Sequence, residues 1–348
     1  MSFSITLAPF GLQFECGDEE TILAAALRQG IGLRYGCKHG ACGSCKARIV
    51  EGEVDLAQAS GFALMGYERD AGMALLCSAY PLDDIVVQIE DYTETELHTA
   101  RPTVARTGRV VTCTPCSPDI WQLVLALEGD EGLDFDAGQF VEVNVPGTDE
   151  WRAYSLANAP SERHLIELLI KKIPDGCFSA LLPAALREGT RVAVRGPYGQ
   201  FNVQVGSAPI VMVAGGRWPV AGGSGMAPIL SMLRALAEQR STREMVFYYG
   251  ARTAADLICG PDLAALEDYL PAFRYIPTIA LPPEAPVWAG ETGLVTEVLA
   301  RAGGNLRGSE AYLCGPPGMI DAAAAVLKTQ GMFSSRIRCD KFVATHGP

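Results

Sequence analysis

The chain has 348 residues, of which 49% are hydrophobic and 20% are charged, and it carries a net charge of −12. This length allows two or three globular domains, and the negative charge argues against a nucleic-acid partner. No apolar run approaches the ~18 residues that a membrane span needs. The amino terminus lacks the basic and apolar regions of a signal peptide, so the eleven cysteines predict a cytoplasmic protein.

The first segment, residues 1–95, alternates short apolar runs with turns. Residues 20–29 have apolar side chains at helical spacing and precede Gly30, which predicts a helix that ends there. The segment holds 6 Lys/Arg against 14 Asp/Glu, a charge that suits docking on a basic protein surface or simply maintains solubility. A small β-rich fold with one helix is expected, and its predicted strands are 4–7, 12–15, 47–51 and 85–90.

Four cysteines of this segment have the spacing of a plant-type [2Fe–2S] ferredoxin. Cys37, Cys42 and Cys45 form a C-x4-C-x2-C pattern in a glycine-rich loop, and Cys77 follows in a distant segment. The alternative is a structural zinc site, but such sites favour paired C-x2-C knuckles, and only one lies among these four. The spacing therefore predicts that the four thiolates ligate an iron–sulfur cluster.

The second segment, 102–205, overlaps the end of a polar, aperiodic stretch at 91–104 that we interpret as a linker. Short β patterns separated by turns fill the segment and predict a small antiparallel barrel. The patterns are 108–112, 120–127, 140–145, 151–157, 165–171 and 191–195.

One of these patterns contains Arg152-Ala153-Tyr154-Ser155. An arginine can pair with a pyrophosphate, a tyrosine can cover a flavin ring and a serine can hydrogen-bond to the flavin. Further along, Gly176-Cys177-Phe178-Ser179 opens a helical run, and a glycine turn at a helix start is a ready anion site. Each motif is weak alone, and together they suggest a flavin site.

The third segment, 206–348, alternates strands and helices and predicts a doubly wound parallel sheet with a dinucleotide site. A glycine-rich turn, 222–225, precedes its first helix and allows backbone amides to approach a pyrophosphate. Cys314-Gly315-Pro316 follows a strand, at the edge where such sheets bind ligands. Cys314 could approach a nicotinamide ring or be a buried inert thiol. The predicted strands are 209–214, 245–249, 274–278 and 311–314, and the helices are 227–239, 255–269, 292–301 and 317–330.

The sequence at 213–216 recurs at 220–223. We favour the second copy as the binding turn, because it joins the helix directly. The first copy follows the strand directly, so the choice between them stays open.

Taken in order, these motifs resemble those of the ferredoxin–NAD(P)H reductase-type electron-transfer proteins. More closely, the chain resembles the reductase component of soluble methane monooxygenase and its relatives, which serve hydroxylases with a di-iron centre. The run at 146–158 and the sequence Asp340-Lys341-Phe342 add to this resemblance, which covers nearly the whole chain. It implies a multidomain protein with a β-grasp [2Fe–2S] ferredoxin domain at 1–95, an antiparallel β-barrel FAD domain at 102–205 and a doubly wound α/β NAD-binding domain at 206–348.

The resemblance also assigns roles to residues that match the family motifs. Three residues near the reacting groups would be Ser155, Cys314 beside the hydride path and Phe342 beside the flavin. The residues expected to hold FAD are Arg152, Tyr154 and Ser155, with Gly176 and Ser179 at its phosphates. Those expected to line NAD(H) are Gly222, Gly223, Ser224, Gly225, Gly315 and Pro316.

The expected function is that of an NADH-dependent reductase, which passes electrons from NADH through FAD and a [2Fe–2S] cluster to the hydroxylase of a hydrocarbon monooxygenase. Arg252 could meet the 2′-phosphate of NADPH, so the choice of NADH follows from the similar proteins. Two alternatives remain at this point. One is the reductase of a Rieske ring-hydroxylating dioxygenase, which shares the domain order, and the other is a non-catalytic metal-binding interaction module.

Overall fold

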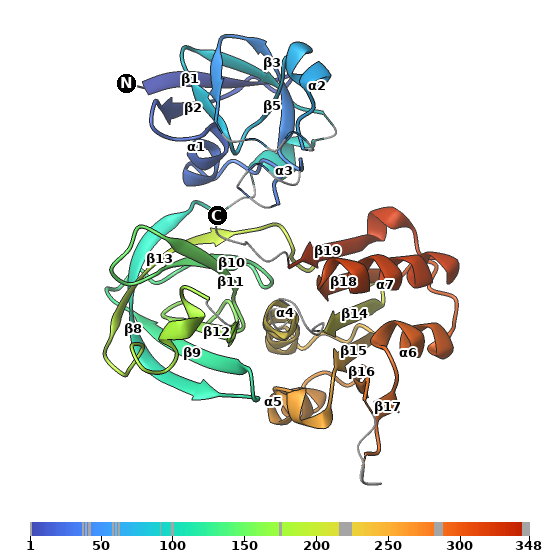
Figure 1. Ribbon diagram of the computed structural model, residues 1–348. Helices are drawn as coiled ribbons and strands as arrows, with labels where there is room; N and C mark the ends of the chain where they lie inside the picture. The colour runs from blue at the N-terminus through green and yellow to red at the C-terminus, as the bar shows by residue number, and fades with distance from the viewer. Residues whose placement is uncertain are drawn as a thin grey trace. The chain divides into compact units, whose positions relative to one another are not determined.

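The structure is a computed structural model that describes residues 2–36, 38, 40, 43–57, 59, 61, 63–90, 92–98, 101–173, 176–215, 225–281 and 288–342 (Figure 1). The chain divides into two compact units. The first comprises Met1–Ala105 with Gly196–Gln200, and the second comprises Arg106–Arg195 with Phe201–Pro348.

The first unit is a mixed sheet that curves around one helix, α1 (Ile22–Arg28). The hydroxyl of Thr21 accepts the N–H of Ala24 and so caps the helix, and the apolar face of α1 is buried. Strand β1 pairs parallel with β7 and antiparallel with β2, which is the arrangement of a β-grasp domain. The sheet order is β2-β1-β7-β3-β5, with β1 (Ser2–Ala8), β2 (Leu12–Gly17), β3 (Lys46–Glu51), β5 (Met73–Leu75) and β7 (Ile85–Gln88). A small second sheet joins β4 (Val54–Leu56) to β6 (Ala79–Pro81), and α2 (Gly66–Asp70) precedes β5.

The stretch at 91–104, expected to be an aperiodic linker, contains a short helix, α3 (Glu94–His98). Its Leu97 is fully buried, and the Leu97 carbonyl accepts the N–H of Gly32. Tyr92 accepts a hydrogen bond from the N–H of Arg34 at 2.7 Å. One apolar side chain among polar neighbours is too weak a periodic signal to predict such a helix.

The barrel of the second unit is a six-stranded sheet in the order β11-β10-β13-β8-β9-β12. The pairs β10–β11, β8–β9 and β9–β12 are antiparallel. A bridge between Leu156 and Leu168 joins the two ends of this order and nearly closes the barrel. The strands are β8 (Val104–Pro115), β9 (Ile120–Leu127), β10 (Phe140–Asn144), β11 (Trp151–Ser155), β12 (Leu165–Lys171) and β13 (Arg191–Tyr198).

The rest of the second unit is a parallel sheet in the order β17-β16-β15-β14-β18-β19. Helices α4 and α5 cover one face and α6 and α7 the other, which confirms the doubly wound fold (Figure 1). The strands are β14 (Ile210–Gly215), β15 (Met245–Ala251), β16 (Phe273–Ile279), β17 (Glu291–Thr292), β18 (Glu310–Gly315) and β19 (Ile337–Lys341). The helices are α4 (Met226–Glu238), α5 (Gly260–Glu267), α6 (Val295–Ala302) and α7 (Pro317–Thr329).

Within the described ranges, no helix has both the length and the apolar composition needed to cross a bilayer.

Candidate cofactor sites

Two of the four predicted cluster ligands lie within the described residues. Cys45 immediately precedes β3, and Cys77 lies in the turn between β5 and β6. Both side chains are buried, and the Cys45 carbonyl accepts the N–H of Leu76 at 3.1 Å, which ties the two segments together. Cys37 and Cys42 lie outside the described residues.

The thiols of Cys45 and Cys77 approach each other closely enough to share a hydrogen bond, and this bond is the main reason that the pKa of Cys77 is lowered. The hydroxyl of Ser78 and the backbone N–H of Gly40 act in the same direction. A thiol that ionises readily beside a second buried thiol is a donor set that fits an iron–sulfur cluster.

The two sequence motifs of the barrel meet in space. The guanidinium of Arg152, on β11, donates from Nη2 to Glu150 at 2.6 Å and to the sulfur of Cys177 at 3.3 Å. The rings of Tyr154 and Phe178 lie with centroids 5.4 Å apart. The Arg-x-Tyr-Ser strand and the turn that begins at Gly176 therefore lie side by side and bring together a guanidinium and a phenol. Burial raises the pKa of Tyr154, so its phenol stays neutral.

Within this turn, Ser179 acts on the backbone. Its buried hydroxyl accepts the N–H of Ile173 at 3.1 Å and lies 3.3 Å from the Ile173 carbonyl. A Cβ atom at Gly176 would overlap the Ser179 hydroxyl. The helical run expected to open at this glycine turn is a single 3-10 turn, Ser179–Leu181.

Glycines bring several backbones together at the carboxyl edge of the parallel sheet. A Cβ atom at Gly225, just before α4, would overlap the carbonyl of Cys314, and one at Gly315 would lie 2.6 Å from the carbonyl of Gly215. A Cβ atom at Gly215 would lie 3.0 Å from the carbonyl of Gly250. The ends of β14, β15 and β18 and the start of α4 thus converge where the strand order reverses, which is where open α/β sheets bind dinucleotides.

The central residues of the glycine-rich turn, Gly222, Gly223 and Ser224, lie outside the described residues. The first copy of the repeated sequence, 213–216, contains Gly215, which is the last residue of β14. The second copy, 220–223, lies outside the described residues.

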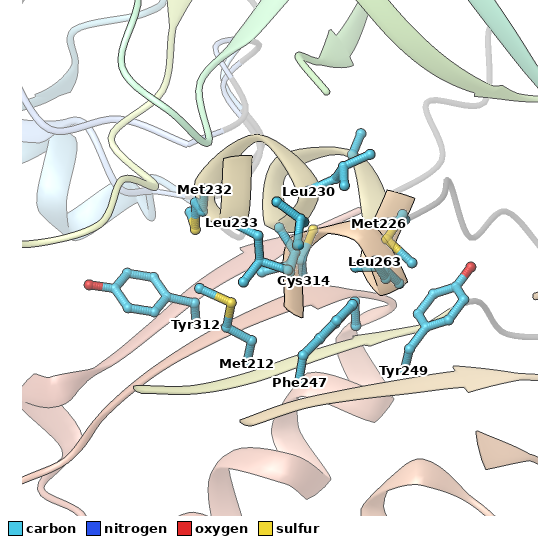
Figure 2. Close-up of a cluster of buried hydrophobic side chains, with 14 of the residues drawn as sticks. Met212, Met226, Leu230, Met232, Leu233, Phe247, Tyr249, Leu263, Tyr312 and Cys314 are labelled. Atoms are coloured by element: carbon cyan, nitrogen blue, oxygen red, sulfur yellow. The ribbon is translucent and has the colours of Figure 1, made fainter. Parts of the chain in front are cut away.

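The side chain of Cys314 is fully buried, below α4 and among core side chains (Figure 2). Burial raises its pKa, so the thiol is neutral. Its sulfur lies 4.0 Å from a carboxylate oxygen of Asp340. Burial raises the pKa of Asp340 to about 6. In the sequence Asp340 is only part of the Asp340-Lys341-Phe342 motif, and its contact with Cys314 follows from the fold.

Backbone contacts hold the residues that follow Asp340 beside the turn after β18. The N–H of Phe342 donates to the carbonyl of Gly315 at 2.9 Å. Phe342 is partly buried against the core that includes Cys314. Pro316 is the N-cap residue of α7, so the turn leads directly into that helix.

Comparison with known proteins gives three family matches along the chain. Residues 5–82 match the 2Fe-2S iron-sulfur cluster binding domain, residues 107–203 the oxidoreductase FAD-binding domain and residues 220–325 the oxidoreductase NAD-binding domain. The predicted cofactors, a [2Fe–2S] cluster, FAD and a nicotinamide dinucleotide, are therefore confirmed at the level of domains.

Similar proteins extend over the full length. The reductase component of propane 2-monooxygenase from Rhodococcus jostii (strain RHA1) is 37% identical over 98% of this chain and 91% of its own. The reductase component of phenol 2-monooxygenase from Pseudomonas sp. (strain CF600) is 38% identical over 98% and 95%. The crystal structure of the Amycolatopsis cytochrome P450 reductase has a TM-score of 0.88 at 32% identity and covers 98% of this chain and 99% of its own. The chain belongs to the ferredoxin–NAD(P)H reductase family, in the group that contains the reductase components of monooxygenases.

Proposed function

We propose that this protein is the NADH-dependent reductase component of a multicomponent hydrocarbon monooxygenase, which delivers electrons to a hydroxylase. The observation that carries this proposal is the full-length similarity to named reductase components, with all three redox domains in one chain. When bound, NADH supplies a hydride, FAD accepts two electrons and releases them singly, and the iron–sulfur cluster carries one electron.

For the flavin, we propose that Arg152, Tyr154 and Ser155 bind FAD, with Gly176 and Ser179 beside its phosphates. The guanidinium of Arg152 supplies a forked cation for a pyrophosphate, and its contact with Cys177 directs it toward the turn. Tyr154 supplies a neutral aromatic face for the ring system. Ser179 contributes through the shape of the turn, because its hydroxyl is engaged with Ile173.

For the nicotinamide nucleotide, we propose a site at the carboxyl edge of the parallel sheet, with Cys314 next to the nicotinamide and Phe342 next to the flavin. The close approach of glycine backbones there supports this assignment, and so does the bond from Phe342 to Gly315. The thiol of Cys314 is neutral and fully buried, so it would border the nicotinamide from the core side without ionising. The residues proposed to line the nucleotide are Gly222, Gly223, Ser224, Gly225, Gly315 and Pro316.

We further propose which residues ligate the cluster, where each domain begins and ends, which type of hydroxylase accepts the electrons and in which compartment the protein works. Cys37, Cys42, Cys45 and Cys77 would ligate the [2Fe–2S] cluster, as their spacing predicts. The domain limits would be 1–95, 102–205 and 206–348, with α3 packed on the first domain. The hydroxylase would be of the di-iron type, and the protein would work in the cytoplasm.

A second candidate acceptor is a cytochrome P450. The reductase subunit of an aromatic O-demethylase from Amycolatopsis sp. is 33% identical over 98% of this chain, and the Amycolatopsis cytochrome P450 reductase has a very similar fold. The alternative of a dioxygenase reductase has weaker support, because the ferredoxin reductase in carbazole 1,9a-dioxygenase is 26% identical at a TM-score of 0.79.

The test is a visible spectrum of the purified protein, followed by reconstitution. We expect flavin and iron–sulfur absorbance that NADH bleaches, and substrate oxidation when a di-iron hydroxylase is added. A colourless protein that does not oxidise NADH would support the interaction-module alternative and contradict the proposal. Turnover with a P450 but with no di-iron hydroxylase would favour the second candidate.

A further inference from the structure

The loop that follows the proposed flavin strand β11 is fixed to strand β12 by its own backbone. The N–H of Ala157 donates to the carbonyl of Glu167 at 2.8 Å, and the N–H of Glu167 donates to the side-chain oxygen of Asn158 at 3.0 Å. Asn158 and Glu167 are both buried. Ala157 is only two residues beyond Ser155, so the position of this loop is directly coupled to the end of the flavin strand.

Helix α4 binds this loop with two polar side chains. Arg234 donates from Nη1 to the carbonyl of Ala157 at 2.9 Å and to Oε2 of Glu167 at 2.5 Å. Its other terminal nitrogen, Nη2, donates to Asp262 on α5 at 2.7 Å. One turn earlier, the fully buried hydroxyl of Ser231 donates to the carbonyl of Asn158 at 2.7 Å. We call these contacts of Arg234 and Ser231 with Ala157, Asn158, Glu167 and Asp262 the Arg234 network.

Both the ionic bonds of Arg234 and the surrounding apolar core hold α4 against the barrel. Burial alone would lower the pKa of Arg234, but Glu167 and Asp262 outweigh this effect and raise it, so the guanidinium is firmly charged. A forked guanidinium that bonds in two directions holds its partners in a fixed orientation. Apolar side chains of the barrel and of α4 also share one core, to which Ile120, Leu169 and Leu230 belong.

We propose that Arg234 and Ser231 are positioning residues that fix helix α4, which begins at the proposed nucleotide-binding residue Gly225, relative to the proposed flavin strand. Helix α4 begins directly after Gly225, and its third helical turn holds the loop that continues β11. Figure 1 shows α4 between the parallel sheet and the barrel. Hydride transfer needs the reacting atoms ~3–3.5 Å apart, and a shift of ~1 Å can cost ~100-fold in rate. This inference rests on the proposed function.

The test compares FAD-loaded Arg234→Met, Arg234→Lys and wild type under anaerobic conditions. Stopped flow gives the rate at which saturating NADH bleaches the flavin, and calorimetry gives the Kd for NAD⁺. We expect the bleaching rate of Arg234→Met to fall about 10- to 100-fold while its Kd for NAD⁺ changes less than about 3-fold. Arg234→Lys keeps the charge without the fork, so its rate should lie between the two.

Arg243→Met is the matched control for a loss of stability alone. Like Arg234, Arg243 forms a buried ion pair, in this case with Glu310. Its other bonds are to the carbonyls of Gln204 and Ala208. Glu310 is the first residue of β18 and so lies at the amino edge of the sheet, opposite the proposed nucleotide site. The inference is overturned if Arg234→Met bleaches within about 2-fold of wild type, if the control slows it equally, or if Kd rises in step with the loss of rate.

A second variant covers the case in which Arg234→Met does not fold. Glu167→Gln keeps the shape and one acceptor but removes the charge that faces Arg234, so a smaller loss of bleaching rate at unchanged Kd is expected. An unchanged rate in Glu167→Gln would then overturn the inference. A wild-type flavin that NADH fails to bleach would overturn the proposed function itself, whereas a bleached wild type beside an equally fast variant contradicts this inference alone.

Discussion

For Cys77, the structure shows a chemical setting that the spacing of the cysteines does not reveal. The pattern predicts that it is a ligand, and the structure adds that its sulfur lies beside Cys45, in a setting that lowers its pKa. We expect Cys77→Ser to lose bound iron and cytochrome c reduction while NADH–ferricyanide activity of the flavin persists, because only the last carrier is removed. Iron analysis and the two assays check this. Cys113→Ser, on barrel strand β8, should leave all three readouts unchanged.

Asp340 is a second residue whose character comes from its surroundings. Its folded pKa, raised to about 6 by burial, lies above that of an unfolded aspartate. The folded state therefore binds the proton more tightly, so this residue's contribution to stability is complete below about pH 4 and is lost as the pH rises through about 6.

It follows that Asp340→Asn should stabilise the protein at pH 8, by about 1–3 kcal/mol, and should have little effect at pH 4. Urea unfolding of both proteins at the two pH values measures this difference directly. A stabilisation of equal size at both pH values would show that the carboxylate is not the titrating group.

At the scale of elements, β14, β15, β18 and α4 can converge because the residues at their contacts are glycines, which have no Cβ atom to collide with a neighbouring backbone. Gly225→Ala places a methyl group against the carbonyl of Cys314, so the start of α4 must move away from β18. We expect the KM for NADH to rise about 10-fold or more, with a loss of stability of about 1–3 kcal/mol. Gly260→Ala is the control, because a Cβ atom there meets no atom within 4 Å. Equal effects of the two substitutions would contradict the role of this close approach.

Elements with strong local signals could be predicted from the sequence, and those formed by distant pairing could not. The apolar runs of β14 and β18 and the helices that alternate with the strands predicted a doubly wound sheet, whereas its strand order comes from the structure. Strand β19 was not predicted, because Ile337 is its only strongly apolar residue and its place depends on pairing with β18. Helix α3 was missed because it depends on the burial of Leu97.

The same limit applies to the candidate sites. The motifs predicted site roles for Arg152, Gly176 and Cys314, because each belongs to a short, recognisable sequence pattern on a strand or at a turn. Arg234 carries no such signal, since it is one of several polar residues on a helix. Its partners Ala157 and Glu167 lie 77 and 67 positions away in the chain, and such long-range polar contacts follow only from the folded arrangement.

At the scale of the whole molecule, negative charge is concentrated where the electrons leave. Residues 1–95 hold 6 Lys/Arg against 14 Asp/Glu, whereas residues 206–348 hold 12 of each. Charge of one sign on a domain steers oppositely charged partners toward it and slows like-charged ones. Both effects weaken as salt shortens the Debye length from ~30 Å at 0.01 M to ~8 Å at 0.15 M.

Salt should therefore change the two artificial acceptors in opposite directions. Reduction of cytochrome c, a basic protein that takes electrons from the cluster, should slow several-fold between about 0.01 and 0.3 M NaCl. Reduction of the ferricyanide anion should stay constant or rise, because repulsion is screened. Measuring kcat/KM for both acceptors, with saturating NADH, separates docking from the flavin reaction. A parallel decline for both would place the salt effect at an earlier step, and the acidic surface would then have no part in choosing the acceptor.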